Sequence, residues 1–181
     1  MFLISNLKIG LLICMLCWIT GMAISLNFPL LIKSESFPNY QLIYNHNITV
    51  NISAFSKVLF NNLFIGLILS VLGYFSFGFI SIIVSIYNGF IFSLYINEFI
   101  MKYSIYSFYL VCFHVPTEFF ALCYLGSIGL RGNKNLIYII SNKEYLYFER
   151  FPSLKVLTFP IILLAFSALI ESDIIFNLLL Q

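Results

Sequence analysis

Residues 58–101 form a stretch of 44 residues that contains a single charged side chain, Glu98. A membrane-spanning helix needs about 20 consecutive apolar residues, so this stretch is long enough for two such helices joined by a tight turn. The turn is predicted within 75–81, around Gly78. The region therefore predicts a helical hairpin that crosses a membrane twice.

The composition of the whole chain agrees with a membrane protein. Hydrophobic residues make up 61% of the 181 residues and charged residues 9%, against about 25% charged residues in a soluble domain. A soluble fold of this size cannot bury so much apolar surface. A soluble enzyme, a nucleic-acid-binding protein and a disordered tail are excluded. The net charge of +2 gives no sign of a nucleic-acid partner.

We predict one all-α membrane domain over residues 1–181, a polytopic helical bundle of about five membrane-spanning helices. The predicted spans are 9–32, 58–78, 80–101, 105–130 and 156–180. A cleaved signal peptide is the alternative for 9–32. Its apolar run is long for such a segment, however, and it has no clear small-residue cleavage site.

The basic residues predict the orientation. Residues 131–155 hold five of the nine lysines and arginines, and the positive-inside rule places this loop in the cytoplasm. Counting back through the spans puts the N-terminus in the cytoplasm and the polar loop 33–57 outside. Within that loop, 48–55 alternates weakly between apolar and polar residues, which leaves a short strand or an interfacial helix open.

Residues 135–148, inside the cytoplasmic loop, are too apolar for a free loop and too charged for a span. Tyrosines mixed with basic residues favour the headgroup zone, so we predict a short interfacial helix on the cytoplasmic face. It serves either as a membrane anchor or as a coupling element that receives motion from a partner. Tyr145 and Tyr147 are the candidate coupling residues.

Small and polar residues recur at helical spacing in the second and third predicted spans. Helices in lipid pack through such residues, so close packing of these two spans on each other is expected. A substrate groove is the alternative. The residues are Gly66, Gly73, Ser81, Ser85, Asn88, Gly89 and Ser93.

His114 and Glu118 are four residues apart, so a helix stacks them on one face. Glu118 is expected near the middle of its span, where an unpaired carboxylate costs several kcal/mol. Pro116 between them is expected to weaken the helix. Glu171 interrupts the last span and lies either at the interface or inside the bundle.

Three roles are open for His114, Glu118 and Glu171: a polar clasp between helices, a proton relay or ligand contact, and a metal site. A metal site is disfavoured, because one histidine and one glutamate are in reach of each other and zinc takes at least three protein ligands. No metal or other cofactor is therefore expected. No catalytic motif is present, and the chain is predicted not to be an enzyme.

The order of several short motifs resembles the stage II sporulation protein M family. The first half matches with Asn62 in Phe-Asn-Asn, Gly73, and the Asn88-Gly89 pair. The second half is similar to the family's His-Gly-x-x-Glu-x-x-Ala motif and its closing Ala-x-Ile-Glu. The corresponding residues here are His114, Glu118, Ala121, Gly126, Gly129, Ala168, Ile170 and Glu171. Val115 stands where the family has a glycine, so the chain resembles a divergent member.

The resemblance implies a multi-span protein of the bacterial cytoplasmic membrane without catalytic activity of its own. Some members work beside a separate ABC-type ATPase in export of, or self-immunity to, circular bacteriocins. Others are sporulation scaffolds that localise peptidoglycan-degrading partners during engulfment. The expected partners are therefore the lipid bilayer and either an ABC-type ATPase or a cell-wall hydrolase complex, with a homo-oligomer left open.

Overall fold

The computed structural model describes residues 7–27, 48–102, 114–140 and 153–179, and the structural statements below concern these residues. They form α-helices joined by turns, without a strand among them. The helices are α1 (Leu7–Asn27), α2 (Ile48–Leu67), the π-helical turn η1 (Ile68–Leu72), α3 (Gly73–Phe75), α4 (Phe79–Lys102), α6 (Val115–Leu130), α7 (Asn133–Ile140) and α8 (Leu154–Leu179). The predicted all-α fold is confirmed.

Four segments are long and apolar enough to cross a membrane, namely Leu7–Asn27, Phe55–Phe75, Phe79–Asn97 and Lys155–Ser172. The predicted fold class, a helical bundle that crosses a membrane several times, is thus confirmed. The predicted span 105–130 is represented by α6, which has 16 residues. The part 105–113 lies outside the described residues, so the number of five passes stays a prediction.

The helix α2 begins at Ile48, inside the outside loop predicted at 33–57, and the part of it that is apolar enough to cross a membrane begins at Phe55. Of the two alternatives left open for 48–55, the short strand is wrong, since this stretch is helical. Its larger apolar residues, Ile48, Ile52 and Phe55, recur every three or four positions and continue into Leu59. That is the period of a helix face and not of a strand.

The turn between α3 and α4 lies at residues 76–78, inside the range predicted from the sequence. Phe77 and Gly78 both have positive φ angles, of 56° and 91°. Gly78 tolerates such a φ because it lacks a Cβ atom. The Ser76 hydroxyl accepts a hydrogen bond from the Ile80 amide at 3.1 Å, which caps the first turn of α4.

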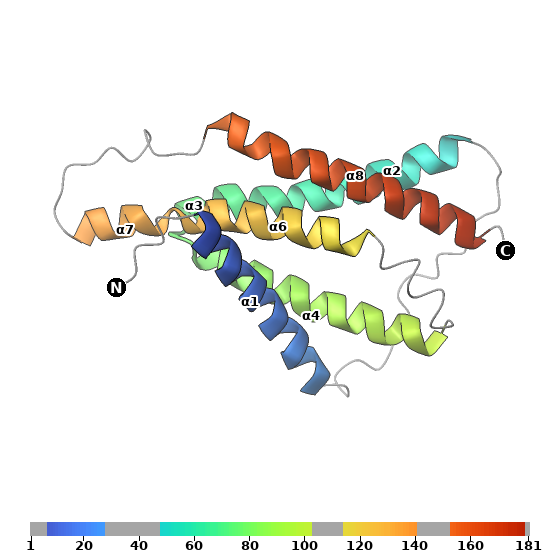
Figure 1. The fold of residues 1–181 in the computed structure, drawn as a ribbon, viewed down its shortest axis with the longest axis horizontal. Coiled ribbons are helices and arrows are strands. Elements are labelled where there is room, and N and C mark those ends of the chain that lie inside the picture. The colour runs from blue at the N-terminus through green and yellow to red at the C-terminus, as the bar shows by residue number, and fades with distance from the viewer. Residues whose placement is uncertain (1–6, 28–47, 103–113, 141–152, 180–181) are drawn as a thin grey trace.

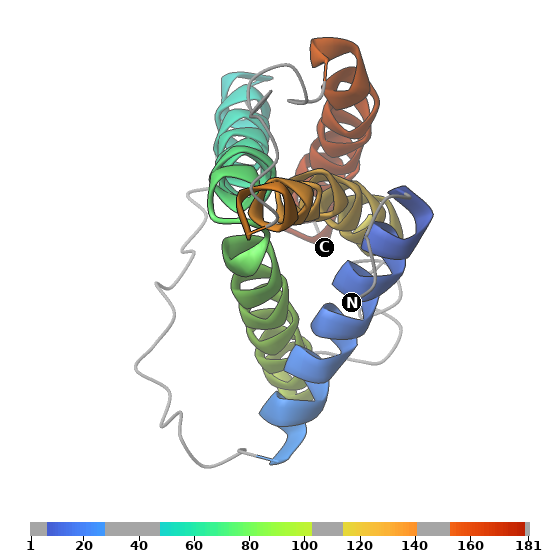
Figure 2. The same cartoon turned by 90° about the vertical axis from the view of Figure 1, so that its left-hand side faces the viewer.

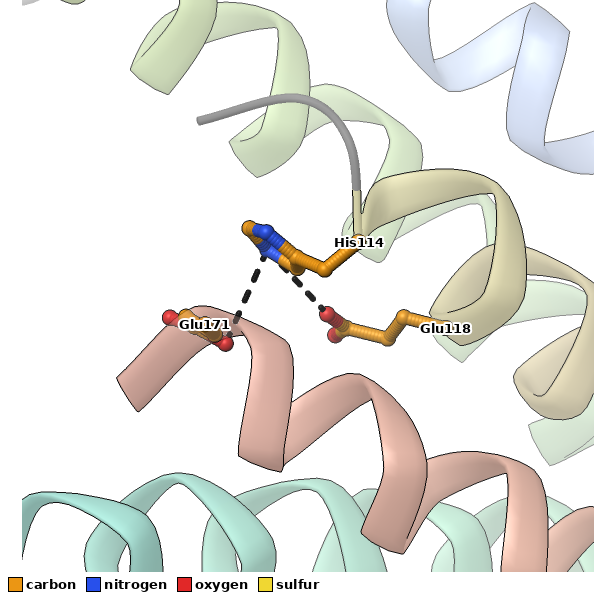
Figure 3. A group of neighbouring side chains, drawn as sticks. All are labelled: His114, Glu118 and Glu171. Atoms are coloured by element: carbon orange, nitrogen blue, oxygen red, sulfur yellow. Dashed lines mark ion pairs between the residues drawn. The ribbon is translucent and has the colours of Figure 1, made fainter. Parts of the chain in front are cut away.

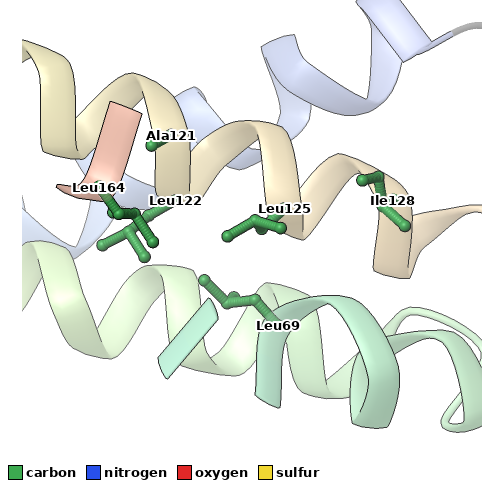
Figure 4. Packing of buried hydrophobic residues seen from close by; sticks show 6 residues of the cluster. All are labelled: Leu69, Ala121, Leu122, Leu125, Ile128 and Leu164. Carbon is green, nitrogen blue, oxygen red and sulfur yellow. The ribbon is translucent and has the colours of Figure 1, made fainter. Parts of the chain in front are cut away.

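The helix α6 lies at the centre of the bundle. It contacts α1 and α4 on one side and α2 and α8 on the other (Figures 1 and 2). Figure 4 shows the core where α6 meets η1 and α8. Its buried residues are Leu69, Ala121, Leu122, Leu125, Ile128 and Leu164. The two outer helix pairs are therefore joined through α6.

Glycines bring the backbones of α1 and α4 into direct contact. A Cβ atom on Gly21 would overlap the Ile86 carbonyl oxygen, and one on Gly89 would overlap the Trp18 carbonyl oxygen. The expected packing of the second span on the third is therefore only partly right. The stripe on α4 meets η1 and α3 at its Ser81 end, but its Gly89 end packs on α1. The physical reason is that α2 and α4 diverge from the turn at 76–78, and α1 fills the space beside α4 (Figure 1).

At the Ser81 end three backbones converge. The Ser81 hydroxyl donates a hydrogen bond to the Leu69 carbonyl at 2.8 Å. A Cβ atom on Gly129 would overlap that same carbonyl oxygen. The π-helical turn η1 was not predicted. Within it, the Ser70 hydroxyl donates a hydrogen bond to the Gly66 carbonyl at 2.7 Å.

The helix α7 starts at Asn133, two residues earlier than the predicted interfacial helix at 135–148. Figures 1 and 2 show α7 continuing from the end of α6 in roughly the same direction. Since α7 does not turn across the end of the bundle, the structure does not show it lying along a membrane surface, and that position stays a prediction. Residues 141–148 lie outside the described residues.

The helix ends alternate in the way that the predicted topology requires. The start of α1, the turn at 76–78 and the junction of α6 with α7 lie toward one end of the molecule (Figure 1). We predict that this end faces the cytoplasm. In a variant without native cysteines, a membrane-impermeant thiol reagent added outside should label Ser53→Cys, at the far end, and not Asn142→Cys. Labelling of Asn142→Cys alone would reverse the orientation.

Candidate functional site

The start of α6 positions His114 and Glu118. His114 directly precedes the helix and already has helical backbone angles, with φ −79° and ψ −22°. The stacking of the two side chains predicted from their spacing is therefore present. Pro116 lies in the first turn, where a missing amide hydrogen costs little. The expectation that it weakens the helix is wrong. Glu118 lies in the first turn of the described helix, and its expected place near the middle of the span 105–130 stays a prediction, because 105–113 lies outside the described residues.

Two helices hold the backbone of His114. Its carbonyl oxygen accepts a hydrogen bond from the Thr117 hydroxyl at 2.6 Å and another from the Ser167 hydroxyl of α8 at 3.3 Å. Ser167 is fully buried. These contacts fix the start of α6 against α8, and neither hydroxyl was identified from the sequence.

The side chains of His114, Glu118 and Glu171 converge, as Figure 3 shows. The His114 Nε2 atom lies 4.0 Å from Glu118 Oε2 and 3.7 Å from Glu171 Oε2. The two carboxylates are each about one quarter exposed, whereas His114 is 7% exposed. Glu171 faces His114 between the helices, and its depth in a membrane stays a prediction. We name these three residues the His-Glu-Glu cluster.

A fourth polar residue borders the cluster. The Asn62 amide of α2 lies against the Glu118 carboxylate, and Asn62 is only 4% exposed. Its Nδ2 atom has no partner in hydrogen-bonding geometry among the described residues. The cluster thus draws on α6, α8 and α2, the helices on one side of the bundle.

The remaining predicted residues lie away from the cluster, in the helix contacts. Asn88 is partly buried. The others are buried in the interior, namely Gly66, Gly73, Ser81, Ser85, Gly89, Ser93, Ala121, Gly126 and Gly129. Trp18 was missed. It packs on Phe92 and Phe119 with ring centroids 5.1 and 4.9 Å away, and so ties α1 to α4 and α6. Tyr145 and Tyr147 lie outside the described residues.

The fold and the cluster together define a helical membrane protein with two acidic groups and a histidine gathered between its helices. The family model of stage II sporulation protein M matches residues 9–174, so the chain belongs to this family. No curated protein and no solved structure matches the chain significantly.

Proposed function

We propose that this protein is a non-catalytic membrane subunit that works with a separate ABC-type ATPase in peptide export or in self-immunity to an exported peptide. The observation that carries the proposal is the place of α6. It contacts the other four long helices, bears part of the His-Glu-Glu cluster at its start, and leads into α7 at its end. A force on α7 would therefore reach all parts of the bundle.

In the proposed coupling, a partner displaces the cytoplasmic loop 131–155. The displacement passes through α7, which is part of this loop, to α6. Asn135 of α7 is buried, and a Cβ atom on Gly132 would overlap the Tyr74 carbonyl oxygen. The junction between α6 and α7 is therefore packed firmly against α3. A firmly packed junction transmits displacement, because close-packed contacts shift together and do not deform gradually.

The proposal predicts that the tyrosines of the loop are needed for coupling. Replacing Tyr145 and Tyr147 together by alanine should uncouple a co-purified ATPase from peptide export or protection while membrane insertion stays normal. The matched control is Tyr87→Ala, which removes a tyrosine that is 60% exposed on α4. If the double variant inserts and protects or exports like the parent, the loop is an anchor only.

A second candidate function is a sporulation scaffold that localises peptidoglycan-degrading partners, and the family description favours it. Isolation of the tagged full chain in a mild detergent separates the two. Recovery of an ABC-type ATPase supports the transport subunit. Recovery of a cell-wall hydrolase complex contradicts it and supports the scaffold.

A further inference from the structure

We propose that the His-Glu-Glu cluster binds one zinc ion that links α6 to α8. This goes beyond the proposed function and does not depend on it. Within one helix, only one histidine and one glutamate are in reach of each other, which is too few ligands for zinc. The structure supplies the missing third ligand, because Glu171 of α8 lies 3.7 Å from His114 Nε2.

The separations between the ligand atoms suit a zinc ion. One ligand atom from each of His114, Glu118 and Glu171 lies within 4.8 Å of the other two. Zinc binds imidazole nitrogen and carboxylate oxygen at about 2.0–2.2 Å, so the ligand atoms of a tetrahedral site lie about 3.3 Å apart. Small side-chain rotations at the two glutamates would bring the ligand atoms to this separation. Three protein ligands leave the fourth position for water.

The charges also favour a divalent cation. Glu118 and Glu171 approach each other between helices, where charge is expensive. None of the described lysines or arginines forms an ion pair with either of them. A protonated His114 balances only one of two carboxylates, whereas a zinc ion bound to neutral His114 and both carboxylates leaves no net charge.

Asn62 gives a second, independent indication. Its amide is nine-tenths buried, lies against Glu118, and has an Nδ2 atom without a hydrogen-bond partner among the described residues. A carboxylate that binds a metal through one oxygen is commonly held by a donor at the other, and Asn62 is placed to be that donor. The Thr117 and Ser167 bonds to the His114 carbonyl fix the backbone that carries the imidazole.

The choice of zinc over magnesium follows from the imidazole. Magnesium prefers oxygen ligands and keeps several waters, while imidazole with carboxylates suits zinc. The cysteines offer a competing site, since Cys14 and Cys17 on α1 are three residues apart. The experiment therefore has to separate thiolate ligands from the His-Glu-Glu cluster.

The test uses the purified full chain in detergent, stripped with EDTA and titrated with zinc against a chromophoric chelator. We expect one zinc ion per chain and at least a tenfold loss of affinity in His114→Gln and in Glu171→Gln, because losing a residue that only orients a metal ligand already costs about 10- to 100-fold and losing a ligand should cost no less. Glu144→Gln, in the cytoplasmic loop, is the matched control and should bind like the parent. Absence of binding, or equal binding by all variants, would overturn the proposal, as would equal competition by magnesium.

A spectroscopic measurement covers the case in which both variants fail to fold. Cobalt added to the parent chain should give the visible absorption of a tetrahedral site with nitrogen and oxygen ligands, and equimolar zinc should abolish it. An intense thiolate-to-cobalt band would place the metal on the cysteines and contradict the proposal.

Discussion

Glu118→Leu is expected to lower the free energy of unfolding of the metal-free protein by about 2 kcal/mol, because it puts an apolar side chain against the buried polar groups of His114 and Asn62, and leaving such groups without a polar contact costs about 1–3 kcal/mol. Asn62 lies against that carboxylate at 4% exposure, and His114 loses one of its two acidic neighbours. Glu118→Gln keeps an oxygen for the Asn62 amide and should cost less than about 1 kcal/mol. Thermal unfolding in detergent with EDTA measures both.

Asn97→Leu controls for the general effect of placing leucine on the helix surface, since Asn97 is exposed on α4. It should leave unfolding unchanged. If Glu118→Leu and Glu118→Gln lower the free energy of unfolding equally, Glu118 does not act as a polar clasp between helices in the metal-free protein. If Glu118→Gln abolishes export or protection while the free energy of unfolding is normal, a structural clasp does not explain the loss of function. A proton-relay or ligand-binding role for Glu118 then replaces it.

Gly21→Ala and Gly89→Ala should each separate α1 from α4. The added methyl group would overlap a main-chain carbonyl oxygen, which cannot rotate away. Overpacking of this kind costs about 3 kcal/mol. Trp18 is the only tryptophan in the chain and lies in this contact at 7% exposure. Undocking of α1 should therefore raise the quenching of its fluorescence by brominated lipid.

Gly66→Ala is the matched control for this contact. Its Cβ atom would meet Leu125 Cδ1 at 2.6 Å, and that methyl group ends a flexible side chain that can move aside. Quenching in this variant should equal that of the parent. If Gly21→Ala and Gly89→Ala also match the parent, the close contact of α1 with α4 is wrong.

The helical membrane class follows from the sequence for a simple physical reason. Lipid provides no hydrogen bonds to the backbone, so long apolar stretches such as 58–101 have to be helices. The turn at 76–78 was predictable too, because a stretch long enough for two spans needs a turn near its middle, and Gly78 lies there. The spacing of His114 and Glu118 likewise placed them on one face.

The tertiary structure decided which helices meet. The pattern of small residues on α4 marks a buried face, but it does not say whether α2 or α1 covers that face. Because α2 diverges from α4, the Gly89 end of α4 packs on α1 instead. In the same way, Glu171 lies 53 residues after Glu118 in the chain, and only the packing of α8 on α6 brings it to His114. Spacing within one helix fixes local geometry, whereas a site shared between helices depends on packing that no local pattern encodes.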